Sequence, residues 1–356
     1  MKIIGVDLHT RQQTIAMLDD RTGELVEREL SHDGEEVRDF YAALPKPVLV
    51  GLEATGAMQW FLQLLEELGI EFRIGHPAKI RAAEPRKQKN DRRDARLLLK
   101  LLAEDRFPAI WMPSREQRDL QILLRHRDQF VRIRTRVQLS LQALALSHGL
   151  RRGHSLWNSA GQHLLRALPL ATHAREQRDA LLALHPHVQA PIDELDRAVE
   201  KEAQQRPQSQ RLMTHPGVGP ITALATEVFL GDPRRFSDGK CVASYVGMIP
   251  RERSSGGRQR FGRISKQGNA LLRFLWGEAA IHAVRGDAEL QRFYRRKLVQ
   301  KGMGKARIAA ARKLGIRLWI MLREEIDYTE FCRRGQLQRQ SGAARAGMPG
   351  VGQWCN

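Results

Sequence analysis

Hydrophobic and polar positions along the first 110 or so residues follow two different periods. Short apolar runs of strand length are bounded by turn residues, and longer segments between them repeat their apolar positions at helical spacing. The runs predict five strands, and the longer segments predict two helices. The strands are expected at residues 3–7, 14–18, 24–30, 48–52 and 70–74, and the helices at 33–44 and 58–68.

Three consecutive strands followed by alternating helices and strands are the element order of a ribonuclease H-like, or RuvC-like, α/β domain. From residue 114 to about 205 the pattern becomes helical, with one apolar stripe at Phe130, Ile133, Val137, Leu141 and Leu144. Proline lacks a backbone donor, so Pro169, Pro186 and Pro191 are expected to break the later part into shorter helices.

These patterns predict an α/β plus α protein with four regions. A ribonuclease H-like domain spans 1–112, a helical coiled-coil spacer spans 113–206, and a mostly helical region spans 207–330. Residues 331–356 are rich in Gly, Ala, Arg and Gln without apolar periodicity, which predicts a disordered tail.

The chain carries a strong positive charge. Its 59 Lys and Arg residues against 40 Asp and Glu give a formal net charge of +19, which favours nucleic acid as a partner. The three cysteines, Cys241, Cys332 and Cys355, have no metal-ligand or disulfide spacing. Without an apolar targeting or membrane-spanning run, we expect a cytoplasmic, nucleoid-associated protein with no membrane partner.

Four carboxylates stand at positions that suit a metal site. Asp7 and Glu53 each follow an apolar strand, and Asp91 and Asp94 are three apart, so they share one face of a helix. Oxygen ligands of this kind suit Mg²⁺ or Mn²⁺, and metal sites of this type support phosphoryl transfer on nucleic acid. The alternative for Asp91 is an acid that only stabilises the start of its helix.

Two segments further along the chain have features of nucleic-acid contact. Gly217 and Gly219 lie in a Gly-Val-Gly turn with the pattern of a helix-hairpin-helix, whose free N–H groups bind phosphate; the alternative is a plain helix connection. Downstream, Ser254 and Ser255 lie in a Gly-rich loop with basic residues on both sides. We expect phosphate contacts from the cations in and near this loop, Arg251, Arg253, Arg258 and Lys266, and from Lys305 on a later basic helix.

The spaced motifs GVDLHT, GLEATG, KNDRRDA, PGVGPITA, GMIPRERSSGG and GRISKQGNALLR resemble the DEDD transposases and Piv-type invertases of the insertion-sequence-110 family. The resemblance implies that Asp7, Glu53, Asp91 and Asp94 form a catalytic metal-binding tetrad. It implies that Ser255 is the catalytic serine, with Ser254 as the adjacent alternative. It also implies a noncoding bridge RNA that pairs with donor and target DNA, and dimers that form a tetramer on DNA.

The hypothesis that follows is a transposase or site-specific recombinase that cuts and rejoins DNA through a serine-phosphodiester intermediate. Its main rival is a metal-dependent, structure-specific nuclease or Holliday-junction resolvase that uses water as nucleophile. A second rival is a nucleic-acid-binding protein in which the acids are structural. A sugar kinase of the actin-like fold also opens with a strand and Gly-x-Asp, but the high charge and the lack of Gly-rich adenosine motifs argue against it.

Overall fold

A computed structural model describes residues 1–84, 90–151, 154–252 and 260–346 of the chain. Ser254, Ser255, Arg253 and Arg258 therefore lie outside the described residues. The chain divides into two compact units, Met1–Pro113 and Ser114–Asn356. None of the described helices is both long enough and apolar enough to cross a membrane.

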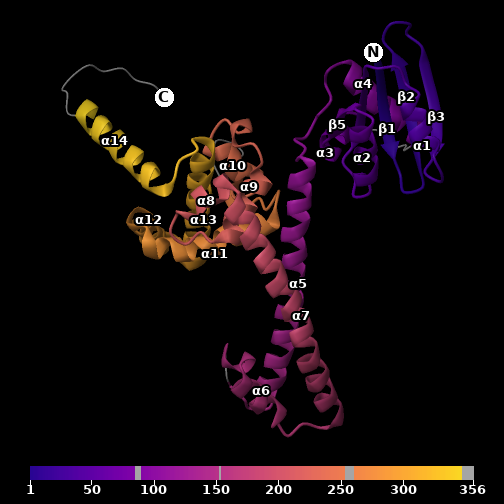
Figure 1. The fold of residues 1–356 in the computed structure, drawn as a ribbon. Coiled ribbons are helices and arrows are strands. Elements are labelled where there is room, and N and C mark those ends of the chain that lie inside the picture. The colour runs from indigo at the N-terminus through magenta and orange to yellow at the C-terminus, as the bar shows by residue number, and fades with distance from the viewer. Residues whose placement is uncertain (85–89, 152–153, 253–259, 347–356) are drawn as a thin grey trace. The chain divides into compact units, whose positions relative to one another are not determined.

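The first unit is built on a five-stranded mixed sheet (Figure 1) with the strand order β3-β2-β1-β4-β5. The first three strands pair antiparallel, and β1, β4 and β5 pair parallel. Each predicted strand and helix of this unit is confirmed. The elements are β1 (Lys2–Leu8), β2 (Gln12–Asp19), β3 (Leu25–Ser31), α1 (Glu36–Ala42), β4 (Val48–Glu53), α2 (Gln59–Glu67), β5 (Glu71–Gly75), α3 (Pro77–Ala83) and α4 (Asp91–Ala103).

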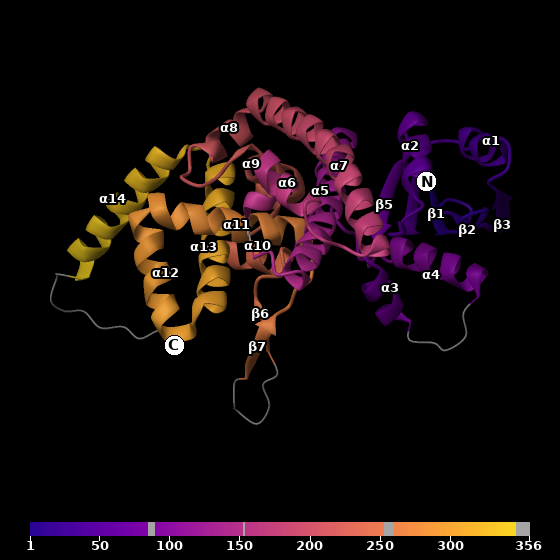
Figure 2. The same cartoon turned by 90° about the horizontal axis from the view of Figure 1, so that it is seen from below.

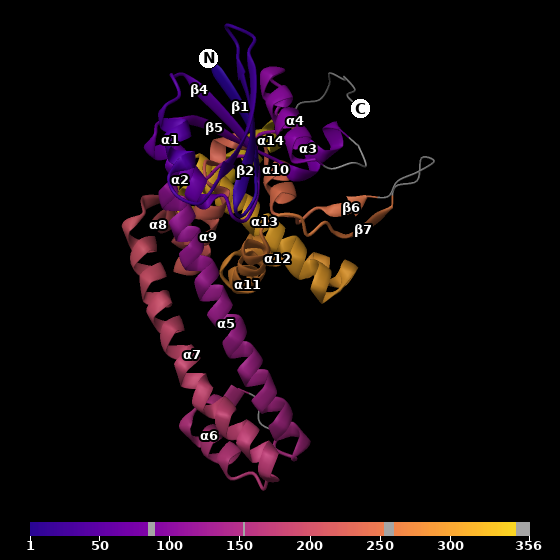
Figure 3. The ribbon, with the colours of Figure 1, turned by 90° about the vertical axis from the view of Figure 1, so that its right-hand side faces the viewer.

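Helices cover both faces of this sheet, with α1 and α2 on one side and α3 and α4 on the other (Figure 3). Strand side chains alternate between the two faces, so the odd and even residues of β1 enter different cores. Ile4 and Val6 pack with the α1 and α2 side, whereas Ile3 packs with α4. The same alternation turns Asp7 toward the α4 side.

Helix α4 lies unusually close to β1, because Gly5 has no side chain. A Cβ atom added at Gly5 would stand 2.2 Å from the carbonyl oxygen of Ala95 and 2.4 Å from the backbone nitrogen of Leu99. Both neighbours are backbone atoms of α4, which cannot move aside as a side-chain tip could. Glycine at this position therefore sets the spacing between the helix and the strand.

The second unit begins with a long helical hairpin, α5 (Arg115–Ser147) and α7 (Thr172–Gln205), which lie side by side (Figure 3). Near its tip, η1 (His154–Trp157) and α6 (Ser159–Arg166) close a small core of Val137, Leu141, Leu165 and Leu182. Pro169 lies between α6 and α7, as expected, but Pro186 and Pro191 do not break the second arm, because α7 is continuous through both. Burial of Val188 and Ile192 compensates for the lost backbone hydrogen bonds.

The remaining elements form a mostly helical bundle with one short antiparallel ribbon, β6 paired with β7, which extends away from the helices (Figure 2). They are α8 (Pro207–Met213), α9 (Pro220–Leu230), η2 (Pro233–Arg235), α10 (Gly239–Tyr245), β6 (Pro250–Glu252), β7 (Phe261–Ile264), α11 (Ala270–Gly286), α12 (Ala288–Lys301), α13 (Met303–Arg323) and α14 (Tyr328–Ala346).

Trp276 lies at the centre of the bundle core. It is fully buried, and its indole N–H donates a hydrogen bond of 2.9 Å to the hydroxyl oxygen of Thr226. Leu120 of α5 and Val199 of α7 belong to the same core. The base of the hairpin therefore packs in the same core as the bundle.

Helix α14 differs from the expected disordered tail, since residues 328–346 are helical. Its start is capped, because the carboxylate of Asp327 accepts the backbone N–H of Glu330 at 2.8 Å. Glu330 in turn forms ion pairs with Arg333 and Arg334 on the next turn. Phe331 packs against the bundle core. The N-terminal cap and these ion pairs therefore stabilise α14 as a helix, although its sequence has little apolar periodicity.

A buried polar cluster joins four separate parts of the bundle. The carboxylate of Asp287 caps α12 by accepting the backbone N–H of Leu290 at 2.7 Å, and it also accepts the hydroxyl of Tyr328 at 2.9 Å and pairs with Arg317. His215, from the turn between α8 and α9, lies against the ring of Tyr328 with its centroid 4.5 Å away. The cluster fixes that turn relative to α12, α13 and α14.

We predict that Gly5→Ala destabilises the first unit by about 1–3 kcal/mol or more, because the new methyl group would meet the backbone of α4. Thermal unfolding followed by circular dichroism measures the loss. Gly56→Ala is the matched control, since a Cβ there meets no atom within 4 Å. An equal melting temperature for the two variants would contradict the proposed close packing.

A second prediction concerns acid stability. Burial lowers the pKa of His215 to about 4, below its ordinary value of 6.5. Between these two values the unfolded chain binds the extra proton more readily, so this histidine's contribution to stability is present above pH 6.5 and is lost as the pH falls toward 4. The loss amounts to roughly 3 kcal/mol at most.

His215→Asn tests this, because an amide can still donate to the Pro216 carbonyl, which lies 2.9 Å from the His215 Nδ1 atom. Urea unfolding between pH 7 and pH 4 should give a shallower pH dependence for the variant than for the parent chain. Identical slopes would show that this histidine does not titrate as its burial requires.

Candidate metal centre

Two of the four predicted acids lie at the ends of neighbouring strands. Val6 pairs with Leu52 in the parallel register of β1 and β4, so Asp7 and Glu53 are the next residues of adjacent strands. Both belong to the side of the sheet that α4 covers. Leu49 packs in that core, and a Cβ at Gly51 would meet Leu102 of α4 at 2.5 Å, which places the odd residues of β4 toward the helix.

The other two acids lie in the first turn of α4. Asn90 caps this helix by accepting the backbone N–H of Arg92 at 3.1 Å, which makes Asp91 the first helical residue. The close contact of Ala95 with Gly5 brings this end of the helix to the end of β1. The positive end of the helix dipole also favours acids in this turn, which is the basis of the alternative that Asp91 only stabilises the start of its helix.

Asp7, His9 and Asp91 come together as one group. The Nε2 atom of His9 lies 3.2 Å from an oxygen of Asp7 and 3.4 Å from an oxygen of Asp91. The three candidate ligand atoms all lie within 4.8 Å of one another. Adjacent ligands of an octahedral Mg²⁺ ion with bonds of about 2.1 Å are about 3 Å apart, so this spacing fits a single ion.

The group is accessible from solvent without being fully exposed. The exposed fractions of the side chains are 18% for Asp7, 34% for His9 and 46% for Asp91. A partly open site of this kind can hold an ion and still admit a phosphate oxygen. Glu53 and Asp94 are half-buried, and neither belongs to the group formed by Asp7, His9 and Asp91.

His9 is the residue that the sequence interpretation missed. It stands two residues after Asp7, and its backbone N–H donates to the Gln12 carbonyl at 3.0 Å where β1 turns into β2. The signal was present in the motif GVDLHT, because residues i and i+2 at a strand end point to the same side. The sequence interpretation names Asp7 as a metal ligand but not His9.

The glycines of the α8–α9 turn have clear structural roles. Gly217 has a φ of +81°, and a Cβ there would stand 2.3 Å from the backbone nitrogen of Ala283 in α11. Gly219 is exposed and is the N-cap residue of α9, followed by Pro220 at the first helical position. Gly217 is thus required by packing, while Gly219 leaves the start of α9 open.

The predicted phosphate-contacting cations within the described residues are all exposed: Arg251 lies in β6, Lys266 follows β7, and Lys305 lies in the first turn of α13. The loop after β7 is held firmly. Arg273 donates to the carbonyl oxygens of Val246, Gln267 and Gly268 at 2.9–3.0 Å.

Models of transposase families match segments of both units. Residues 4–148 match the model of a DEDD transposase named after IS110, and residues 209–295 match the model described as the transposase IS116/IS110/IS902 family. A "Probable family 20 transposase" of Pseudomonas aeruginosa is 30% identical over 338 residues, covering 91% of this chain and 98% of that protein. This chain belongs to the IS116/IS110/IS902 family of transposases.

Other relatives agree with this assignment. The transposase for insertion sequence element IS1111A of Coxiella burnetii is 25% identical over 340 residues, covering 92% of this chain and 91% of its own length. The transposase for insertion sequence element IS1328 of Yersinia enterocolitica is 25% identical over 287 residues, covering 78% and 82%. The expected family is therefore confirmed, and with it an enzyme that acts on DNA.

We predict that Asp7→Asn and Asp91→Asn each weaken Mn²⁺ binding by the full-length transposase by about tenfold or more. Calorimetric titration of the purified chain with Mn²⁺ measures the affinity. Asp105→Asn is the control, because Asp105 belongs to the same unit and its side chain is 92% exposed. If Asp91 only stabilises its helix, Asp91→Asn will lower the melting temperature and leave the Mn²⁺ affinity unchanged.

Proposed function

We propose that this transposase cuts and rejoins DNA through a phosphoserine intermediate at Ser255, assisted by a divalent metal ion held by Asp7, Glu53, Asp91 and Asp94. The observation that carries the proposal is the convergence of Asp7, His9 and Asp91, from a strand end and a helix start, on one small volume. The mixed sheet order β3-β2-β1-β4-β5 supports a ribonuclease H-like (RuvC-like) fold for the first unit.

The donor set fits the proposed ion. Carboxylate oxygens are hard ligands that Mg²⁺ and Mn²⁺ prefer, and one imidazole nitrogen is compatible with Mn²⁺. A bound ion would supply Lewis-acid stabilisation of charge on the phosphoryl oxygens. All four acids would hold the ion in this assignment, and Asp7 and Asp91 are the two that already lie close together. Glu53 is next to Asp7 in the sheet register, and Asp94 lies one turn after Asp91 in α4, so both would complete the ligand set.

The proposed chemistry conserves the phosphodiester. The Ser255 oxygen bonds to phosphorus, the bond from phosphorus to the 3′ oxygen breaks, and the serine proton ends on the leaving 3′ hydroxyl. The 3′ oxygen of a partner strand then bonds to phosphorus, the bond from phosphorus to the serine oxygen breaks, and the proton of that 3′ hydroxyl ends on the serine oxygen. Because the energy of the broken linkage is kept in the phosphoserine, rejoining needs no nucleotide cofactor.

The proposed DNA contacts lie in the second unit. We assign phosphate binding to the turn around Gly217 and Gly219, as in a helix-hairpin-helix, and to Arg251, Arg253, Arg258, Lys266 and Lys305. The start of α9 supports the first assignment, since its N-cap residue Gly219 is exposed and caps with no side chain. The net charge of +19 supports the second.

A bridge RNA and a homo-oligomer complete the proposal. The net positive charge would serve RNA as well as donor and target DNA. The acids and the serine belong to different units of the chain, so the proposal requires that they meet at one phosphodiester, within one protomer or between protomers of a dimer or tetramer.

We predict that Ser255→Ala abolishes the covalent protein-DNA adduct while DNA binding persists, because only the attacking oxygen is lost. The adduct is measured by denaturing electrophoresis of reactions with end-labelled donor DNA. Ser254→Ala is the matched control and should still form the adduct. Loss of the adduct in Ser254→Ala alone would move the nucleophile to the neighbouring serine. Cleavage without any adduct in the parent chain would favour a nuclease that uses water.

The same assay tests the metal-binding acids. Asp94→Asn should reduce Mg²⁺-dependent adduct formation by about a hundredfold or more, since each invoked electrostatic group of this kind contributes roughly 3 kcal/mol to the rate. Asp105→Asn again serves as the control. Full activity of Asp94→Asn would remove this residue from the metal-binding set.

A further inference from the structure

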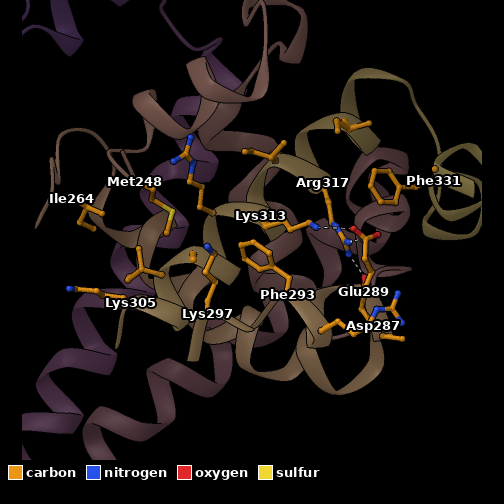
Figure 4. A pocket seen from close by; sticks show the side chains of 18 of the residues that line it. Met248, Ile264, Asp287, Glu289, Phe293, Lys297, Lys305, Lys313, Arg317 and Phe331 are labelled. Carbon is orange, nitrogen blue, oxygen red and sulfur yellow. Dashed lines mark hydrogen bonds and ion pairs between the residues drawn. The ribbon is translucent and has the colours of Figure 1, made fainter. Parts of the chain in front are cut away.

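A large groove lies in the second unit, and none of the proposed metal-binding acids lines it. Its volume is about 1240 Å³, and its walls come from α12, α13, α14 and β7 (Figure 4). Small-molecule pockets usually measure about 300–1,000 Å³, so the groove is large enough for an extended ligand rather than one small molecule. Gly262, Arg263 and Ile264 of β7 form one end, near Met248.

The groove carries an excess of unpaired positive charge. Its acids, Asp287 and Glu289, are both engaged by ion pairs: Arg317 pairs with both, and Lys313 pairs with Glu289 at 2.8 Å. Six other lining cations form no ion pair with any residue in the described part of the chain: Arg263, Lys266, Arg292, Lys297, Lys305 and Arg312. A polyanionic ligand would supply the missing counter-charge.

The floor between these cations is apolar. Phe293 of α12 lies at the centre of the groove, with Lys297, Lys305 and Lys313 around it (Figure 4). The Nζ atom of Lys313 stands 4.9 Å from the centre of the Phe293 ring. Ile308 and Ile316 of α13 also line the groove and are half-buried. A ligand for this floor must carry flat or apolar groups as well as charge.

We infer that the groove binds an unpaired segment of the DNA strand, with a base against Phe293 and the backbone phosphates at Lys297, Lys305 and Arg312. Single-stranded nucleic acid combines negatively charged phosphates with flat aromatic bases. Proteins bind it by stacking aromatic side chains on the bases and by placing cations along the phosphates. Duplex DNA would present only phosphates here, because its bases are stacked inside the helix. The apolar floor would then stay uncovered.

DNA rather than RNA is assigned as the ligand because this chain belongs to a family of transposases, which act on DNA. To this extent the inference rests on the proposed function. It adds a site in the second unit for an unpaired segment of that DNA.

The first test measures binding without catalysis. Fluorescence anisotropy with a labelled 12-nucleotide DNA strand, its duplex and an RNA of the same sequence uses full-length Ser255→Ala protein in EDTA. Phe293→Leu should weaken single-strand binding about five- to tenfold, because the stacking surface is lost while an apolar side chain remains. Duplex binding should change less than twofold.

The charge contacts are tested by Lys297→Gln combined with Lys305→Gln. This double variant should bind the single strand about tenfold more weakly, and the slope of log affinity against log salt should fall by about 1.4, or 0.7 for each lost phosphate contact. Lys201→Gln combined with Lys240→Gln removes the same charge from exposed positions on α7 and α10, outside the groove. That control should keep parental single-strand affinity.

A chemical probe avoids dependence on variants that misfold. Cys332 lines the groove, and Cys241 is exposed outside it. In a Cys355→Ser background, the single strand should slow maleimide labelling of Cys332 at least threefold without slowing that of Cys241. Mass spectrometry of the peptides measures both rates.

Three results would overturn the inference. The first is equal loss of affinity in the groove variant and its charge-matched control. The second is duplex binding that falls as much as single-strand binding. The third is tighter, groove-dependent binding of the RNA, which would assign the groove to RNA. Since these assays contain no metal and no reactive serine, they can fail while the covalent adduct still forms, and the two proposals remain distinguishable.

Discussion

The close contact between α4 and β1 is the constraint on which the acidic site depends. Gly5 lets the backbone of the helix approach the strand, and the first turn of the helix then lies beside the end of β1. Asp7 and His9 come from the strand, and Asp91 comes from the helix. A larger residue at position 5 would separate these elements and with them the ligands. Sheet register alone, which aligns Asp7 with Glu53, would bring together only two of the acids.

The second unit depends on a different interaction, the buried carboxylate of Asp287. It caps α12 and at the same time contacts Arg317 of α13 and Tyr328 of α14. A buried charge is costly unless its hydrogen bonds are satisfied, and here several partners satisfy it. Because His215 packs on Tyr328, the α8–α9 turn is attached to the same cluster. The helices that form the cationic groove are thereby held in register with the proposed DNA-contacting turn.

The sequence allowed most of the first unit to be predicted, and the reasons are physical. Buried strands such as Val48–Glu53 read as apolar runs between turn residues, and their terminal acids stand out. The role of His9 was not predicted, because it depends on a helix more than eighty residues away. The continuity of α7 through Pro186 and the helical state of α14 were also missed. Both depend on contacts, burial against α5 in one case and the Asp327 cap in the other, that composition does not reveal.

The α5–α7 hairpin has two separate sources of stability along its length. Its base shares the Trp276 core, through Leu120 and Val199, whereas its far end closes a small core of its own around Leu141. Between these cores the hairpin buries Val188 and Ile192 of α7 and pairs polar side chains, such as Arg134 with Gln189 at 3.1 Å. The distal end is therefore modular: natural variation in its length, or an engineered exchange of the tip, would be accommodated without repacking the body of the protein.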